Sequence, residues 1–140
     1  MHKAILLVAG GILALIGAAT LLFPTAFHGL TGTDVEGSAA LLSELRAPGG
    51  ALVAIGVLVV AGAFQPPLAA ASSLVGALTY LSYAASRVLS SALDGLPPTK
   101  LLIATAAELA LGLACLHQLR RPLVPVRPTG CDRGSPARSR

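Results

Sequence analysis

Four long stretches that are nearly free of charged side chains restrict the possible folds of this chain more than any other feature. Residues 4–23 contain no charged residue at all. A helix that crosses the hydrocarbon core of a bilayer needs about 20 predominantly apolar residues. The same criterion is met three more times, so we expect membrane-spanning helices at residues 4–23, 47–65, 67–92 and 99–119.

The composition supports lipid as the solvent of this chain. Charged residues make up 11% of the sequence and hydrophobic residues 54%, whereas a soluble domain has about 25% charged residues. Prolines next to each predicted span limit the helices, because proline cannot continue a helix interior. We therefore predict an all-α fold, an integral membrane four-helix bundle formed by residues 1–120.

The segment before the second span is less regular. Residues 38–47 can extend the second helix on the outer side of the membrane, and Pro48 with the two glycines after it suggests that the helix bends or restarts there. Residues 24–46 otherwise form the expected outer loop. In the first span, Gly10, Ala14 and Ala18 form a stripe of small residues that allows close helix contact.

The distribution of Lys and Arg predicts the orientation. Lys3 precedes the first span and many arginines follow the fourth, whereas the loop at 24–46 has only Arg46 against three acidic residues. Cytoplasmic flanks are enriched in Lys and Arg, so we expect both termini in the cytoplasm and the protein in the cell inner membrane. Residues 121–140 should form a disordered basic tail whose arginines interact with anionic lipid headgroups. Nucleic acid is not an expected partner.

Two ionisable residues lie inside predicted spans, Arg87 in the third and Glu108 in the fourth. Both fall in the outer half of the membrane, where such residues usually face the protein interior or a water-filled cavity. Tyr83 shares a helix face with Arg87. Three interpretations remain open: a structural Arg–Glu pair, a polar pocket that binds a small polar or anionic ligand, or an Arg87 side chain that extends to the outer interface.

Three further charges approach this region from the same outer side. Glu44 and Arg46 lie where the second span begins, and Asp94 lies in the turn after the third. Glu44 and Arg46 can bring their charges to the region where Arg87 and Glu108 need partners, and the sequence leaves open which of these charges pair. The candidate site, either ligand-binding or structural, therefore comprises Glu44, Arg46, Tyr83, Arg87, Asp94 and Glu108.

The sequence contains no pattern typical of a catalytic or cofactor site. Its two cysteines, Cys115 and Cys131, have no metal-ligand or redox spacing, and its histidines are dispersed. No nucleotide-binding glycine loop is present. We predict no catalytic residue, no metal and no cofactor.

The segments "LSELRAPGG", "YLSYAASRVLSSALDGLPP" and "AELALGL" resemble a bacterial family of small four-helix membrane proteins of unknown function, which is similar to the wider DoxX-like group. The resemblance covers roughly residues 1–120. It implies a four-helix bundle and no established reaction, and it points to Glu44, Arg46, Arg87, Asp94 and Glu108. Some DoxX-like proteins are associated with quinone- or thiol-linked redox complexes, which is an analogy at the level of fold.

These observations favour a non-enzymatic accessory or ligand-binding membrane protein. The alternative is a small oligomeric transporter or a subunit of a membrane redox complex, because 140 residues leave little room for alternating access within one chain. Beyond the bilayer itself, the expected partners are another membrane protein or further copies of this chain.

Overall fold

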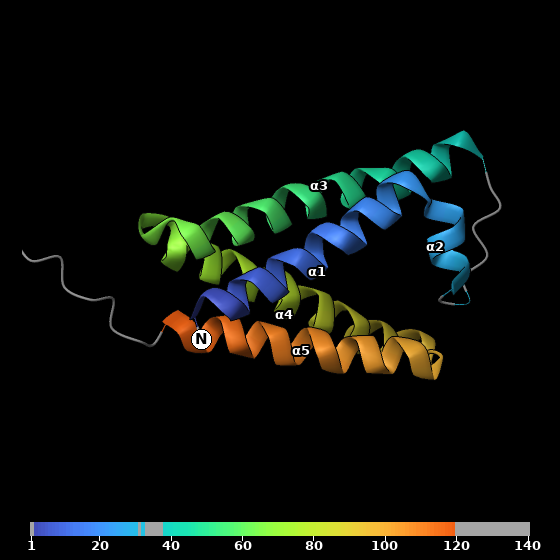
Figure 1. The fold of residues 1–140 in the computed structure, drawn as a ribbon. Coiled ribbons are helices and arrows are strands. Elements are labelled where there is room, and N and C mark those ends of the chain that lie inside the picture. Colours follow the sequence, from blue (N-terminus) through green and yellow to red (C-terminus); the bar gives the residue numbers. More distant parts are fainter. Residues whose placement is uncertain (1, 31, 33–37, 120–140) are drawn as a thin grey trace, which may run out of the picture.

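The structure, a computed structural model, describes residues 2–30, 32 and 38–119, and every regular secondary-structure element within them is a helix (Figure 1). The helices are α1 (His2–Leu22), α2 (Pro24–Leu30), α3 (Ala39–Phe64), α4 (Ala69–Asp94) and α5 (Thr99–Leu119), with a short 3-10 helix η1 (Pro66–Leu68) before α4. Four segments, Lys3–Leu22, Ala39–Phe64, Pro66–Asp94 and Thr99–Leu119, are long and apolar enough to cross a bilayer. The predicted all-α class and the four membrane-length helices are confirmed. The predicted tail at 121–140 lies outside the described residues.

The expected outer loop contains a short helix, α2, which corrects the prediction made from sequence, whereas the predicted extension of the second helix over residues 38–47 is present in α3. Pro24 begins α2, where proline is tolerated because the first amide of a helix has no partner. The amide of Phe23 still donates to Ala19 O at 2.9 Å, so the chain turns from α1 into α2 with little interruption. α3 begins at Ala39, capped by the Ser38 hydroxyl, and runs to Phe64 with Pro48 inside it. It does not restart at Pro48.

Glycines bring α1 and α3 into close contact. A Cβ atom on Gly10 would lie 2.7 Å from Gly56 O, and one on Gly56 would lie 2.5 Å from Ala14 N. The same relation holds one level further along, where a Cβ on Gly17 would lie 2.7 Å from Gly49 O. No side chain fits between these backbones, and such contacts stabilise helix pairs in lipid, where there is no hydrophobic driving force between helices. We call these four glycines the glycine seam.

α4 and α5 form the second antiparallel pair. The connection between them turns at Gly95, whose φ of 98° lies in the left-handed region that side-chain-bearing residues rarely adopt. The two pairs meet at the end of the molecule that holds the start of α1 and the end of α5, and they diverge toward the opposite end (Figure 1). We call these the packed end and the open end.

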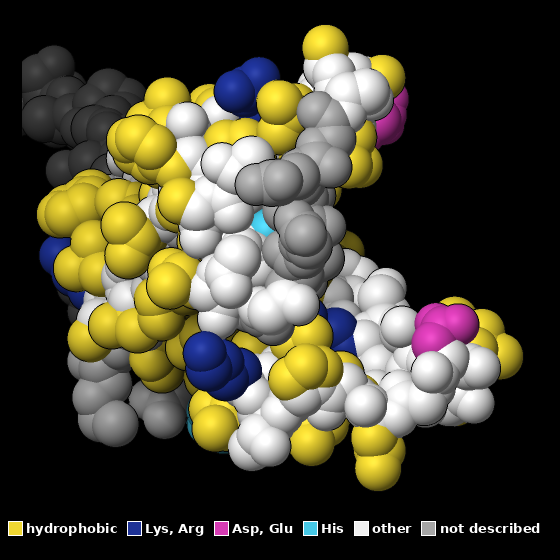
Figure 2. All heavy atoms as spheres, turned by 90° about the vertical axis from the view of Figure 1, so that its right-hand side faces the viewer, with side chains coloured by type: hydrophobic (Ala, Val, Ile, Leu, Met, Phe, Trp, Pro, Cys, Tyr) yellow, Lys and Arg dark blue, Asp and Glu magenta, His cyan; other side chains and the backbone are white. Residues whose placement is uncertain are grey.

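The open end carries charged side chains that are spread out rather than gathered. Figure 2 looks at this end and shows hydrophobic side chains over much of the surface, with acidic groups at two well-separated places. Large apolar side chains also face outward along the length of the helices, including Leu15, Val57, Leu78 and Ile103, each more than half exposed. Such a surface is typical of helices that face lipid.

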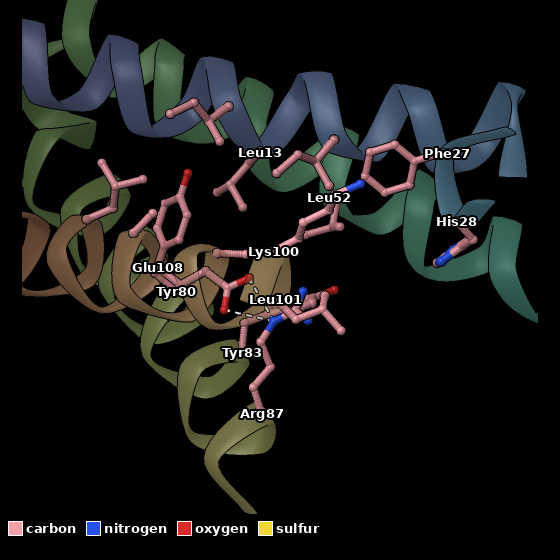
Figure 3. Close-up of a pocket in the computed structure, with 15 residues that line it drawn as sticks. Leu13, Phe27, His28, Leu52, Tyr80, Tyr83, Arg87, Lys100, Leu101 and Glu108 are labelled. Carbon is pink, nitrogen blue, oxygen red and sulfur yellow. Dashed lines mark hydrogen bonds and ion pairs between the residues drawn. The ribbon is translucent and has the colours of Figure 1, made fainter. Parts of the chain in front are cut away.

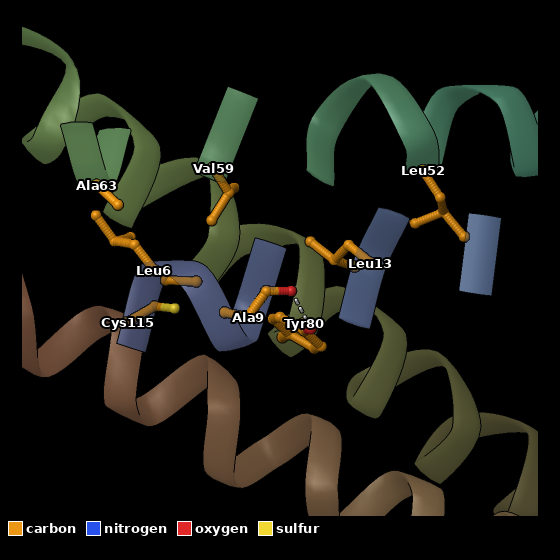
Figure 4. Close-up of a cluster of buried hydrophobic side chains, with 9 residues drawn as sticks. Leu6, Ala9, Leu13, Leu52, Val59, Ala63, Tyr80 and Cys115 are labelled. Carbon is orange, nitrogen blue, oxygen red and sulfur yellow. Dashed lines mark hydrogen bonds between the residues drawn. The ribbon is translucent and has the colours of Figure 1, made fainter. Parts of the chain in front are cut away.

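A cavity occupies the space left where the two pairs diverge (Figure 3). The buried core fills the packed end instead, where Leu6, Ala9, Val59 and Cys115 are fully buried between the four long helices (Figure 4). The molecule therefore has one closely packed half and one half that contains an internal space.

Candidate functional site

The cavity at the open end has a volume of about 370 Å³ and is bounded by α1, α2, α4 and α5, with Leu52 contributed by α3. Its apolar side chains come mainly from α1 and α5, and they include Ile12, Leu13, Ile16, Leu101 and Leu111. Its polar side chains come from α2, α4 and α5: His28, Tyr80, Tyr83, Arg87, Lys100 and Glu108. This volume lies within the range of about 300–1,000 Å³ that is usual for small-molecule sites.

An ion pair between α4 and α5 lies at the centre of the polar wall (Figure 3). Arg87 Nε donates to Glu108 Oε2 at 3.1 Å and to Oε1 at 3.2 Å. The side chains are 33% and 15% exposed, respectively, so the carboxylate is the better shielded partner. Both residues lie roughly 10–13 Å from the helix ends at the α4–α5 connection. Arg87 therefore pairs with Glu108 rather than extending to the interface, and both side chains also line the cavity.

The pair engages only one edge of the guanidinium. Arg87 donates through Nε, and its two terminal amino groups have no protein acceptor within the described residues. A guanidinium presents five N–H donors in a fixed fork, so most of the donor capacity of Arg87 is still available beside the cavity.

Tyr80 closes the cavity toward the packed end. Its hydroxyl donates to Ala9 O at 2.7 Å, and the residue is 3% exposed (Figure 4). The bond links α4 to α1 at the level where the core begins. Tyr83, one turn further along α4, is more exposed and lines the cavity without a hydrogen bond to any other described residue.

Two groups at the mouth were not among the residues predicted from sequence. Lys100, in the first turn of α5, lines the cavity and donates from Nζ to Leu30 O at 3.2 Å, which connects α5 to the end of α2. His28 also lines the cavity, and its ring packs edge-on against Phe27 with 5.6 Å between centroids. The sequence did contain a signal for Lys100, because this charged residue follows Pro98 at the start of the fourth span. No sequence signal pointed to His28, because the helix that carries it, α2, was not expected.

The remaining predicted site residues lie at the same end but outside the cavity. Glu44 and Arg46 are exposed on the first turns of α3 and do not line the cavity. Asp94 is exposed at the end of α4 and accepts a hydrogen bond from Ser90 Oγ at 3.0 Å. The structure therefore brings Tyr83, Arg87 and Glu108 together at the cavity and leaves the other three apart.

A second space and a buried thiol lie outside the cavity. A second space, of about 450 Å³, lies along α4 and α5 and is lined by Leu81, Val88, Leu109 and other small or apolar residues with Thr105. Cys115 is a free, buried thiol. Within residues 2–30, 32 and 38–119 there is no group of three or more His, Cys, Asp or Glu side chains placed to hold a metal ion.

Fold and cavity together define a small multi-pass membrane protein with an ion pair in a largely apolar cavity. The chain belongs to the family described as a domain of unknown function, DUF4345, whose match covers residues 1–119. No curated protein and no solved structure matches the chain. The family match therefore covers all four membrane-length helices and the complete cavity, and it assigns no activity to them.

Proposed function

We propose that this protein is a non-enzymatic, ligand-binding four-helix bundle of the cell inner membrane, which holds a small amphiphilic molecule in the cavity at its open end. The observation that carries the proposal is the division of the cavity wall: apolar side chains from α1 and α5 face a polar strip that includes Tyr83, Arg87 and Glu108. An amphiphile likewise has an apolar body and a polar head group.

The energetic cost of the polar strip supports this proposal. A charged residue at the centre of a membrane helix costs about 2.5–3.5 kcal/mol on insertion scales. Replacing a buried ion pair with apolar residues of similar volume is often neutral or stabilising. Joining α4 to α5 through Arg87 and Glu108 therefore costs more free energy than apolar packing would, and contact with a polar ligand accounts for the presence of the charged pair.

The proposed orientation places the cavity toward the outside of the cell. The start of α1 and the end of α5 lie at the same end of the molecule (Figure 1). The bias of Lys and Arg toward the N-terminus and the segment after residue 119 favours the cytoplasm for that end. In this arrangement the basic segment 121–140 meets anionic headgroups of the inner leaflet, and the open end admits ligand from the outer leaflet.

A second candidate function is a subunit of an oligomeric transporter or of a quinone- or thiol-linked redox complex, as the similarity to the DoxX-like group suggests. The observation that favours it is the apolar space along α4 and α5, which could accept a helix of another copy or of a partner protein. The mass of the protein in detergent separates the two candidates, since a stable dimer or larger assembly favours the second.

Occlusion of the cavity tests the binding function directly. Ala106 and Ala107 are both exposed on α5, but Ala107 lines the cavity and Ala106 does not. In nanodiscs of neutral phosphatidylcholine, two 12-carbon photoreactive probes, one a carboxylate and one an alcohol, would be cross-linked to the wild type, Ala107→Phe and Ala106→Phe. We expect at least one probe to label cavity residues in the wild type and in Ala106→Phe, and neither to label them in Ala107→Phe. Equal labelling of cavity residues in both variants would contradict the proposal.

A further inference from the structure

We infer that the cavity selects a monoanionic amphiphile with a single apolar body, whose head group is bound by the terminal amino groups of Arg87 in the positive field of Lys100. This inference rests on the proposed binding function and adds the chemical class of the ligand. It follows from the charges, the unused donors and the dimensions of the cavity.

The charges that line the cavity do not balance. Arg87 and Lys100 are positive, and Glu108 is the one carboxylate among the lining residues. His28 also lies at the mouth, and as a neutral imidazole or an imidazolium it adds no negative charge. Glu108 is already engaged by Arg87. One positive charge therefore remains without a counter-charge in the cavity wall, which matches a ligand with one negative charge.

Hydrogen-bond donors are also in excess. Arg87 uses Nε for Glu108, and Lys100 makes one hydrogen bond, to Leu30 O. The terminal amino groups of Arg87 and the remaining N–H groups of Lys100 have no acceptor from the described residues. A carboxylate offers two oxygens in the planar arrangement that a guanidinium binds best. A cationic head group would instead meet two like charges and find Glu108 already occupied.

The wall limits the ligand to one negative charge as well as one chain. A dianionic head bound to Arg87 would exceed the one positive charge of the wall that lacks a counter-charge, and its second negative charge would be repelled by the Glu108 carboxylate in a medium of low dielectric. The volume of about 370 Å³ lies near the lower limit for small-molecule sites. From Lys100 to Leu111 the cavity follows α5 for about 16 Å, and about 12 Å of this length lies between Lys100 and Glu108. A head group at the ion pair therefore leaves room for a single apolar chain that extends from there toward the mouth.

The positions of the polar and apolar groups define the orientation of such a ligand. The ion pair of Arg87 and Glu108 lies between the mouth and Tyr80, which closes the space toward the packed end with its hydroxyl bonded to Ala9 O (Figure 3). Phe27 and Leu52 line the wall on the mouth side of the pair (Figure 3). An amphiphile with its head group at Arg87 would therefore place its apolar chain along Phe27 and Leu52.

Competition against the photoreactive carboxylate tests the inference in the same neutral nanodiscs. The competitors are dodecanoate, dodecanol and dodecyltrimethylammonium, which share one chain and differ in charge. We expect dodecanoate to displace the probe at a concentration at least about tenfold lower than either of the others, the effect of a charge-assisted hydrogen bond.

Three variants locate the source of the selectivity. Arg87→Lys retains a cation for Glu108 but loses the forked donors, and Lys100→Gln removes a charge at an exposed position whose one hydrogen bond is to Leu30 O. Each should reduce the preference for dodecanoate several-fold and leave displacement by dodecanol unchanged. Arg46→Gln removes a charge from the same end of the molecule but outside the cavity, and it should change neither.

The possible failures can be distinguished. Suppose that Ala107→Phe abolishes labelling but dodecanol or dodecyltrimethylammonium competes as well as dodecanoate. The cavity then binds amphiphiles without selecting an anion, and the inference is wrong while the binding function stands. An Arg46→Gln effect as large as that of Lys100→Gln would also overturn it, because the selectivity would come from net charge. Labelling that survives Ala107→Phe overturns the binding function itself.

Discussion

The packed end and the open end of this molecule are built from the same four long helices, but they differ in how closely the helices pack and in whether charged side chains lie between them. At the packed end, Leu6, Val59 and Cys115 are fully buried, and the helices meet without charged groups in the core. At the open end, the helix pairs diverge around a cavity that contains Arg87 and Glu108. The glycine seam runs along α1 and α3 through both halves and holds this pair together where α4 and α5 diverge from it.

The comparison shows how a small membrane protein can hold a polar cavity without losing its fold. In lipid, close packing of small residues and interhelical hydrogen bonds replace the hydrophobic effect as the main sources of helix association. The packed end and the seam supply this contact, so the open end can carry groups that are costly to place in a membrane. Substitutions at four places in the molecule test this division, in order of decreasing effect on stability.

The largest effect is expected in the glycine seam. Gly56→Leu places a side chain where even a Cβ atom would lie 2.5 Å from Ala14 N, so α1 and α3 must separate. We expect a loss of about 3 kcal/mol or more in the free energy of unfolding, measured as thermal unfolding in detergent. Gly50→Leu, on the same helix with no atom within 4 Å of its Cβ position, should be close to the wild type. Equal effects would mean that the seam does not hold the pair.

The second largest effect concerns the ion pair. Arg87→Leu and Glu108→Leu each leave one charge without its partner, and each should lower the free energy of unfolding by about 2 kcal/mol. The double variant should recover most of this loss, because no orphaned charge remains. It should also lose the preference for dodecanoate. If all three unfold like the wild type, the pair does not link α4 to α5 in the membrane.

A smaller effect is expected at the boundary between the two ends. Tyr80→Phe removes the hydroxyl that donates to Ala9 O at 2.7 Å, and we expect a loss of about 1 kcal/mol in unfolding free energy, typical of one interhelical hydrogen bond. Tyr83→Phe is the matched control, since its hydroxyl makes no hydrogen bond within the described residues. A Tyr83→Phe loss as large as that of Tyr80→Phe would contradict this assignment.

The smallest effect is expected at the mouth. Lys100→Gln removes an exposed hydrogen bond to Leu30 O, and such surface contacts contribute less than about 0.5 kcal/mol. Thermal unfolding should hardly change, whereas the anion preference should fall. A large loss of stability would mean that the link between α5 and α2 holds the open end together, and Lys100 would then be a structural residue.

The sequence predicted the helices well because hydropathy over about 20 residues is a strong signal. It also identified Arg87 and Glu108, since a charge inside a span is conspicuous, but their mutual contact depends on how α4 and α5 face each other, which periodicity leaves open. α2 was missed because seven residues between Pro24 and Leu30 give too short a pattern. Glu44 and Arg46 were expected at the cavity because depth in the membrane is readable from sequence, whereas the direction in which α3 faces is set by the glycine seam.

Thiol reactivity in intact membranes tests the central comparison most directly. Three positions on α5 are compared in a Cys131→Ser background: native Cys115 in the core, Ala107→Cys at the cavity and Ala106→Cys on the exposed outer surface of the helix. The two introduced cysteines also carry Cys115→Ala, so that each protein has a single thiol. A charged methanethiosulfonate reagent reacts with a thiolate that water can reach. We predict rapid labelling of Ala107→Cys and slow labelling of Cys115 and Ala106→Cys. Equal rates at Ala106→Cys and Ala107→Cys, or a reactive Cys115, would contradict a closed packed end beside an open, hydrated cavity.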